Sequence, residues 1–330
     1  MTSSTRTAGP ILMRAVIQQT FGGPEVLQVS DVPKPVPLPT EVLVRVRAAG
    51  INPVDWQTRE GAGMAQVLGV PPFVLGWDVA GVVEAVGFGV STLAVGDEVY
   101  GMPWFPRAAG GYGAYVTAPA RQFARKPASI TMEQAAAAPL AALTAWQALV
   151  DTAKVTAGQR VLITAAAGGV GHFAVQFARL LGAHVSATAG ARNHEWLTRL
   201  GAETVIDYTQ VRFEEQIQDV DVVIELVGGP DDTGVRSLKA LRPGGLLVAV
   251  PGGVSPELQA AADAQGKRVT AFLVEPDGAA LARIGAHIDA GEVQVEVDRV
   301  FPLHAVAEAH ALVAARHTRG KIVLSIGEAL

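Results

Sequence analysis

The sequence predicts a mixed α/β protein, in which a β-rich unit is followed by a doubly wound parallel sheet. Near the start, residues 14–18, 41–49 and 77–86 form β-branched or alternating runs broken by glycine and proline, which is typical of strands and turns. From residue 161, short apolar runs alternate with helix patterns, as in a parallel sheet covered on both faces. The composition is globular, because 49% of the residues are hydrophobic and only 17% are charged.

The individual elements can be placed from these patterns. Residues 1–12 are expected to form a disordered extension, and the prolines within residues 33–39 predict an extended connector, since proline has no N–H for a ladder. An Ala- and Leu-rich helix is predicted over residues 132–149. Further strands are predicted over residues 161–165, 184–188, 204–207, 220–226 and 246–250, with helices over 171–181 and 193–200. The last elements are a helix (279–290), a strand (293–301), a helix (305–315) and a strand (321–326).

The composition excludes several classes of function. A net charge of -5 over 330 residues argues against a nucleic-acid surface, which needs a basic field. The lack of cysteine excludes disulfides, thiolate nucleophiles and cysteine-ligated metals. No stretch is long and apolar enough to span a membrane. We therefore expect a cytoplasmic protein without a nucleic-acid or membrane partner.

A glycine-rich turn provides the strongest functional signal. It joins the strand that starts at Val161 to the following helix, and it matches the pattern G-x-G-x-x-G with Ala166, Gly168 and Gly171 at the three glycine positions. Gly168 lets the backbone approach a pyrophosphate, and Gly171 lets the helix pack closely on the strand. The N-terminus of that helix supplies free N–H groups and the positive end of a dipole. This strand–turn–helix context predicts a dinucleotide site rather than an ordinary tight turn.

The residues after the second strand of this unit indicate which dinucleotide binds. An NAD-binding protein has an acidic residue there for the ribose hydroxyls, but residues 188–193 contain none. Arg192 would instead attract a 2′-phosphate with bidentate geometry. The alternative is a solvated arginine at the start of a helix, a position that the helix dipole does not favour for a cation. We therefore predict NADPH as the cofactor.

Several sequence blocks resemble those of one known family. The chain resembles the zinc-independent medium-chain dehydrogenase/reductases, in particular the quinone oxidoreductase-like (zeta-crystallin-like) branch, from Met13 to Ile326. The blocks that carry the resemblance are residues 49–56, 75–87, 95–101, 143–149, 165–171, 200–208, 241–245 and 318–323. The resemblance implies a GroES-like β-rich catalytic domain (residues 1–140 and 277–330) around a Rossmann cofactor domain (residues 141–276).

The positions of the zinc ligands in related enzymes are informative. Zinc-dependent relatives have Cys where this chain has Asn52, and Gly-His-Glu where it has Gly-Trp-Asp ending at Asp78. Their third ligand, also a Cys, falls near Leu140. Asn and Trp at the first two positions provide no zinc site, so we predict no metal. Without a Lewis acid, a quinone or an enone is the expected acceptor, because conjugation spreads the developing negative charge.

Two other functions stay open at this point. One is an alcohol or ketone dehydrogenase, which the missing zinc ligands disfavour. The other is a non-catalytic, crystallin-like NADPH-binding protein, because catalyst and binder both need the glycine-rich turn.

The resemblance also implies roles for single residues. It makes Asn52 a polar residue of the substrate site and gives Asp55 a role that is more structural than catalytic. It implies cofactor contacts, with one expected phosphate ligand missing because Gly190 stands where many relatives have Ser. The implied cofactor residues are Thr144, Ala167, Gly168, Gly169, Val170, Gly171, Thr188, Gly190, Arg192, Tyr208, Val227, Val250, Pro251, Phe272, Val274 and Lys321.

The histidines and one predicted strand lead to further expectations. His172 is interpreted as solvated or next to a phosphate, and His304, His310 and His317 as surface residues. Residues 268–274 are expected to form the apolar edge strand of the doubly wound sheet. Relatives join two such edges across a two-fold axis, so the resemblance implies a homodimer through this strand.

Overall fold

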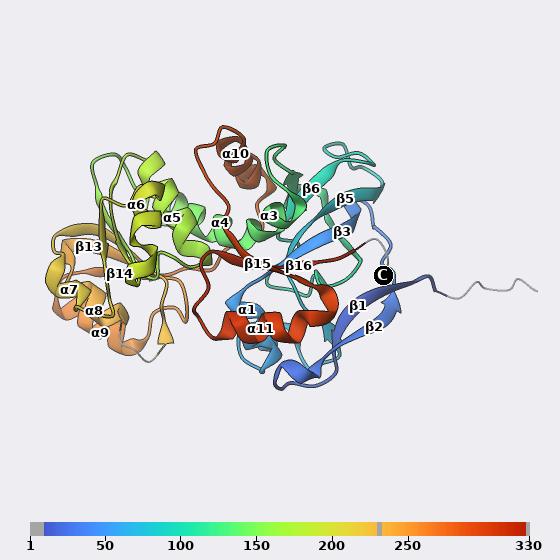
Figure 1. Ribbon diagram of the computed structural model, residues 1–330, viewed down its shortest axis with the longest axis horizontal. Helices are drawn as coiled ribbons and strands as arrows, with labels where there is room; N and C mark the ends of the chain where they lie inside the picture. Colours follow the sequence, from blue (N-terminus) through green and yellow to red (C-terminus); the bar gives the residue numbers. More distant parts are fainter. Residues whose placement is uncertain (1–9, 230–232, 328–330) are drawn as a thin grey trace, which may run out of the picture.

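The fold consists of two lobes, which Figure 1 shows side by side in a computed structural model. The structure describes residues 10–229 and 233–327, so most of the expected N-terminal extension lies outside the described residues. The expected α/β fold is confirmed, with a β-rich GroES-like lobe and a Rossmann-like parallel sheet. The limits of the two domains stay a prediction.

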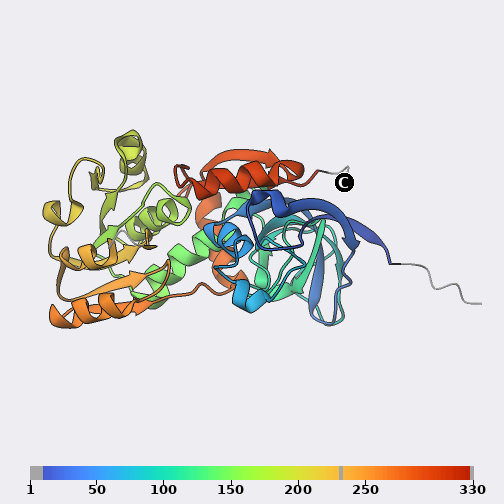
Figure 2. The same cartoon turned by 90° about the horizontal axis from the view of Figure 1, so that it is seen from below.

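The β-rich lobe contains two sheets. A three-stranded sheet has the order β2-β1-β4, and a seven-stranded sheet has the order β15-β16-β3-β5-β6-β8, with β7 also paired to β3. The first sheet consists of β1 (Leu12–Gln18), β2 (Leu27–Pro33) and β4 (Phe73–Val74). The second consists of β3 (Glu41–Ile51), β5 (Asp78–Val86), β6 (Glu98–Gly101), β7 (Tyr115–Pro119), β8 (Phe123–Arg125), β15 (Val297–Pro302) and β16 (Lys321–Ser325). Because β16 pairs antiparallel with β3, the end of the chain returns to the first lobe (Figure 2).

The second lobe is built on a six-stranded sheet with the order β11-β10-β9-β12-β13-β14. All neighbouring strands in it are parallel. The strands are β9 (Arg160–Ile163), β10 (His184–Thr188), β11 (Thr204–Ile206), β12 (Val220–Glu225), β13 (Leu241–Ala249) and β14 (Arg268–Ala271). Their carboxyl ends therefore meet along one edge, where a doubly wound sheet binds its ligand.

Helices cover both faces of this parallel sheet. Successive side chains of a strand point to opposite faces. Accordingly, Val161 belongs to the core cluster under one set of helices, whereas Leu162 belongs to the cluster under the other. The first face is covered by α5 (Gly169–Leu180) and α6 (His194–Leu200), and the second by α7 (Phe213–Gln216), α8 (Thr233–Leu238) and α9 (Pro256–Ala264).

The single helix expected over residues 132–149 is wrong. The structure has α3 (Met132–Ala137), then α4 (Pro139–Trp146), then a π-helical turn over Gln147–Thr152. Pro139 explains the break, because it lacks an N–H and is suited to the first turn of a new helix. The remaining helices are α1 (Pro53–Arg59), α2 (Ala65–Leu68), α10 (Gly278–Asp289) and α11 (Val306–Ala314).

The predicted edge strand is shorter than expected, because β14 ends at Ala271. Beyond β14, the side chain of Gln147 makes the backbone hydrogen bonds that a neighbouring strand would otherwise make. It donates to the carbonyl of Glu275 (2.9 Å) and accepts from the N–H of Glu275 (2.9 Å). These two contacts fix the chain beside the π-helical turn instead of at the sheet edge.

Candidate functional site

The carboxyl edge of the parallel sheet gathers the predicted cofactor residues. Most of them lie within four residues of the end of a parallel strand or in the turn before α5, as the resemblance implies. Thr144 lies on α4 and Lys321 starts β16, so these two come from other elements, and the Lys321 side chain lies beside Gly169 of the glycine-rich turn. The fold thus brings residues from distant parts of the chain to the glycine-rich turn and the strand ends around it.

The glycine-rich turn has the geometry of an anion site. Gly168 is the N-cap of α5, and Gly168, Gly169 and Val170 are partly exposed. The first N–H groups of a helix have no acceptor within it, so they are available to a phosphate. A Cβ on Gly168 would meet only the Ala165 carbonyl, at 3.3 Å, which leaves the space in front of the turn open. The residues present therefore fit a dinucleotide pyrophosphate.

Gly171 has the packing role that the motif predicts. A Cβ at this position would lie 2.5 Å from the carbonyl oxygen of Ala165 and 2.6 Å from the Cα of Ala166. Both atoms belong to the backbone and cannot rotate away. Only glycine lets α5 begin this close to the turn.

The residues predicted near the adenosine phosphates follow or end β10 and β11, and they differ in exposure. Arg192 is exposed, and its Nη2 donates to the carbonyl of His317 at 2.5 Å. Gly190 has φ -67°, and a Cβ there would meet nothing within 4 Å. Tyr208 is 56% exposed. Thr188 is buried, and its hydroxyl accepts from the N–H of Ala165 (3.2 Å), so this side chain braces the glycine-rich turn.

Glu225 is a buried acid that was not among the predicted site residues, and it fixes the turn after β12. Glu225 ends β12 and accepts from the backbone N–H groups of Val227 (2.9 Å) and Gly228 (3.2 Å). Burial raises the pKa of this carboxyl, while those N–H donors oppose the rise. These two hydrogen bonds hold Val227 just after the end of β12. Val250 and Pro251 follow β13, and Phe272 and Val274 follow β14, at the same edge of the sheet.

Asn52 is placed by a helix cap. It directly follows β3 and is the N-cap of α1, with Pro53 at the first helical position. Asp55, at the third position of α1, accepts from the backbone N–H of Asn52 at 2.7 Å. The sequence Asn-Pro-Val-Asp carries this capping signal, which would have predicted α1 instead of a loop.

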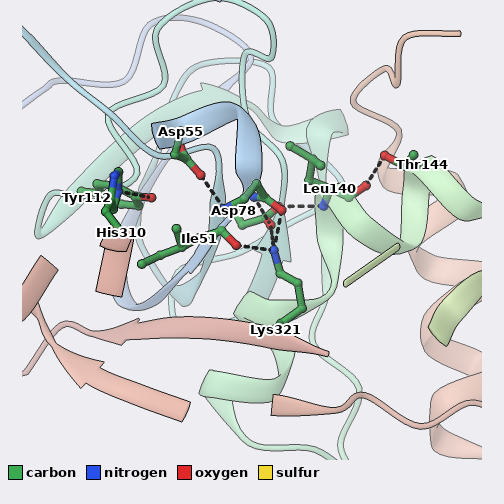
Figure 3. Close-up of polar contacts among 9 residues, drawn as sticks. Ile51, Asp55, Asp78, Tyr112, Leu140, Thr144, His310 and Lys321 are labelled. Atoms are coloured by element: carbon green, nitrogen blue, oxygen red, sulfur yellow. Dashed lines mark hydrogen bonds and ion pairs between the residues drawn. The ribbon is translucent and has the colours of Figure 1, made fainter. Parts of the chain in front are cut away.

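Asn52 also belongs to a buried polar cluster with Asp78 and Lys321 (Figure 3). Its Nδ2 donates to Oδ2 of Asp78 at 2.8 Å, and its Oδ1 accepts from Nζ of Lys321. Nζ of Lys321 also donates to the carbonyl of Ile51 (2.7 Å) and lies 3.6 Å from Oδ2 of Asp78. The charged end of Lys321 therefore lies within this cluster, next to Asn52.

Asp78 extends this cluster to α4. Its Oδ1 accepts from the backbone N–H of Leu140 at 2.7 Å. The carbonyl of Leu140 in turn accepts from the hydroxyl of Thr144 at 2.7 Å. The helix that carries Thr144 is thus connected to Asp78, as Figure 3 shows, and Asp78 in turn accepts from Asn52.

Burial dominates the electrostatics of Asp55. Burial and the charge of Asp78 raise its pKa to about 7, although the N–H of Asn52 and the charge of Lys321 oppose the rise. Tyr112 lies beside it, and burial and the charge of Asp55 raise the pKa of this phenol. A carboxyl in this environment exchanges its proton near neutral pH.

Two histidines are buried, so the surface position predicted for His310 and the solvated alternative for His172 are wrong, while a place next to a phosphate stays a prediction for His172. His172 is fully buried, and its ring lies against the Gly168 carbonyl (Nδ1, 3.1 Å) and the Glu296 N–H (Nε2, 3.4 Å). His310 is also fully buried, between Nη1 of Arg59 and the hydroxyl of Tyr112, each at 3.3 Å. Burial lowers the pKa of His172 to about 4 and that of His310 to about 3, so both rings are neutral at pH 7. His304 and His317 are exposed as expected.

The described residues contain neither a metal-ligand cluster nor a helix that could span a membrane. Over residues 10–229 and 233–327, no group of three or more His, Cys, Asp or Glu is placed to hold a metal ion. Within the same ranges, no helix has the length and apolar character needed to cross a bilayer.

Comparisons with known proteins agree with this geometry. A family model described as "Alcohol dehydrogenase GroES-like domain" matches residues 38–128, and one described as "Zinc-binding dehydrogenase" matches residues 200–324. The NADPH-dependent alkenal/one oxidoreductase of Arabidopsis thaliana, a chloroplastic protein, is 35% identical over 325 residues, which cover 96% of this chain and 80% of the relative.

Two solved structures are also similar. The quinone oxidoreductase of Coxiella burnetii has a TM-score of 0.91 and 36% identity, and the match covers 96% of this chain and 100% of that one. The quinone oxidoreductase of Escherichia coli, solved in complex with NADPH, has a TM-score of 0.84 and 30% identity, with 95% and 100% covered.

Proposed function

Since the chain belongs to the quinone oxidoreductase-like branch of the medium-chain dehydrogenase/reductases, we propose that it transfers hydride to a quinone or another α,β-unsaturated carbonyl compound without zinc. The chain is an NADPH-dependent oxidoreductase. The acceptor class and the independence from zinc are the proposed parts.

The observation that carries this proposal is the orientation of the Asn52 amide. Its Oδ1 accepts from Lys321, and one hydrogen of Nδ2 is donated to Asp78. An amide has a second Nδ2 hydrogen, and this donor remains for a ligand. A neutral N–H donor stabilises an oxyanion whose charge is spread by conjugation, whereas a simple ketone needs a stronger electrophile. The cluster contains an amide, a carboxylate and an ammonium, and these are not the thiolate and imidazole ligands of a zinc site.

The cofactor roles are proposed from position. The turn from Ala167 to Gly171 would hold the pyrophosphate, and Arg192 would hold the 2′-phosphate after it releases the His317 carbonyl. Thr144 and the residues after β12, β13 and β14 would surround the nicotinamide end. When bound, NADPH supplies the hydride. Asn52 then contacts the oxygen of the acceptor. Asp55 holds the backbone of Asn52 in place by accepting a hydrogen bond from its N–H.

A panel of acceptors tests this proposal. NADPH oxidation is followed at 340 nm, the nicotinamide absorbance band, with quinones, alkenals, enones and saturated ketones, in the presence and absence of a metal chelator. The proposal expects turnover on the conjugated acceptors, unaffected by the chelator. Turnover on saturated ketones alone would favour a ketone dehydrogenase. Stoichiometric NADPH binding without turnover on any acceptor would favour a non-catalytic binding protein.

Assembly and location stay predictions. A homodimer through the edge near β14 is supported by the 53% exposed side chain of Leu273, two residues after that strand. Size-exclusion chromatography with light scattering tests it, and a monomeric mass would contradict it. The predicted cytoplasmic location needs an experiment of its own, because the A. thaliana relative is named as chloroplastic.

A further inference from the structure

We propose that Asp78 and Lys321 are positioning residues, whose buried ion pair orients the Asn52 amide toward the acceptor. This inference rests on the proposed function. It assigns Lys321 to the substrate side, whereas the resemblance implies a cofactor contact.

The contacts of Lys321 support this role. Its side chain is 3% exposed, and its Nζ lies among the carbonyl of Ile51, Oδ1 of Asn52 and the carboxylate of Asp78. Nζ donates to the carbonyl of Ile51 and to Oδ1 of Asn52, and its charge lies 3.6 Å from the carboxylate of Asp78. The ammonium is thus directed at the Asn52 amide and held there by two hydrogen bonds and one opposite charge.

The Asn52 amide is oriented by charge at both ends. A cation faces its Oδ1 and an anion accepts from its Nδ2, so a rotation by 180° would place Nδ2 against Lys321 and Oδ1 against Asp78. Both reversed contacts would be repulsive. A hydrogen bond between neutral groups would not discriminate between the two orientations as strongly.

The pair is anchored from both lobes. Asp78 is 0% exposed and also accepts from the N–H of Leu140 at the start of α4. The N–H of Gly320 donates to the carbonyl of Ala167 (2.9 Å), and a Cβ on Gly169 would lie 2.8 Å from Cδ of Lys321. The stem of Lys321 thus packs against the glycine-rich turn while its charge reaches Asn52. Any displacement of the pair would move the amide relative to that turn.

Because burying two charges is costly, the Asp78–Lys321 pair is better explained by the orientation of Asn52 than by a gain in the stability of the fold. Burial lowers the pKa of Lys321 and raises that of Asp78, while each charge opposes the shift of the other. Replacing a buried ion pair by neutral groups of similar volume is often neutral for stability, whereas removing one partner leaves an uncompensated charge. The neutral double replacement therefore separates positioning from folding.

The test compares the double variant Asp78→Asn/Lys321→Met with the wild type. A matched control is Asp97→Asn/Arg125→Met, which removes an exposed ion pair of the β-rich lobe (2.8 Å). We measure the melting temperature, the Kd of NADPH by fluorescence, kcat and KM for a turned-over acceptor, and the crystal structure of each variant. Asn52→Ala is made alone and in the double variant.

The expected result is a folded double variant with an NADPH Kd within about threefold of the wild type. Its kcat falls by about 10- to 100-fold, the range for a displaced positioning group, and adding Asn52→Ala lowers kcat no further. Its crystal structure shows the Asn52 amide turned or disordered. The control variant keeps the wild-type kcat.

Three outcomes would overturn the inference. They are a tenfold weaker NADPH affinity with kcat retained, kcat losses that multiply when Asn52→Ala is added, and an unchanged amide in the crystal structure. If the double variant does not fold, Asp78→Asn alone is measured in the same way, because Asn preserves the shape of the side chain. If the wild type turns over no acceptor, the proposed function fails, and the crystallographic position of Asn52 still decides this inference.

Discussion

The two ends of the proposed site are built in opposite ways. At the proposed adenosine end, Arg192 and Tyr208 are exposed, and Arg192 donates to the backbone carbonyl of His317. At the other end, the side chains of Asn52, Asp78 and Lys321 are at most 3% exposed and contact one another. Exposed charged groups are solvated and can move to a ligand, whereas buried ones hold a fixed geometry. The difference suggests that the exposed end selects the cofactor and the buried end orients the acceptor.

The largest expected effect lies between the two ends, at Gly171. We expect Gly171→Ala to destabilise the protein by about 1–3 kcal/mol, the usual cost of overpacking, and to abolish NADPH binding. The added Cβ would overlap backbone atoms of Ala165 and Ala166. Urea unfolding and fluorescence titration measure both effects.

The matched control for this substitution is Gly190→Ala, because a Cβ there meets nothing within 4 Å. Its stability should stay within about 0.5 kcal/mol of the wild type. Equal effects of the two substitutions would contradict the packing role of Gly171.

A second prediction concerns Asp55 at the buried end. Its pKa rises from an ordinary value of 3.8 to about 7, so between these values the folded state binds a proton that the unfolded state has lost. Stability therefore falls as pH rises through this window and levels off above it. Asp55→Asn removes this contribution and should gain stability relative to the wild type between about pH 5 and pH 8.

Urea unfolding of the wild type and Asp55→Asn across this pH range provides the measurement. The groups facing Asp55 are Asp78, Lys321 and Tyr112, and they are unchanged in the variant. Parallel stability curves for the two proteins would show that the Asp55 carboxyl does not retain its proton.

A third prediction tests selection at the exposed end. Arg192→Ala should raise KM for NADPH by about 10- to 100-fold, since charge-assisted hydrogen bonds contribute about 1.5–3 kcal/mol. KM for NADH should not change, because NADH lacks the 2′-phosphate. Arg121→Ala, at an exposed arginine of the β-rich lobe, is the control. An equal rise in KM for NADPH and for NADH would contradict the proposed role of Arg192.

The smallest expected effect is a gain in apparent affinity for NADPH, again at the exposed end. Gly190→Ser should lower KM for NADPH by about 3- to 10-fold, the effect of one added hydrogen bond. The backbone at Gly190 has φ -67°, which any residue adopts, and the space around its Cβ position is empty. Steady-state kinetics with NADPH and NADH measure the change. A gain shared by both cofactors would place the new hydroxyl away from the 2′-phosphate.

Local signals explain what the sequence predicts well. The turn at Gly168 and Gly171 is predicted because strand, turn and helix are contiguous in the chain. The parallel strands are predicted because each is a short apolar run. The break before α4 also has a local signal, Pro139, but the single helix predicted over residues 132–149 does not take it into account.

The buried end depends instead on contacts between distant segments. Asp78 and Lys321 belong to separate strands that only the fold brings together, on either side of Asn52. The burial of His310 likewise results from the packing of α11 against Arg59 and Tyr112. No periodicity within α11 or β16 indicates these partners, so the sequence predicts a surface position for His310 and, by resemblance, a cofactor contact for Lys321.

Isotope transfer tests the central claim most directly. The protein is incubated with an enone and NADPH carrying deuterium at both C4 positions of the nicotinamide, and the product is analysed by NMR and mass spectrometry. The account predicts a saturated carbonyl product with deuterium on the β-carbon. Deuterium on the carbonyl carbon of an allylic alcohol, or a product without deuterium, would contradict it.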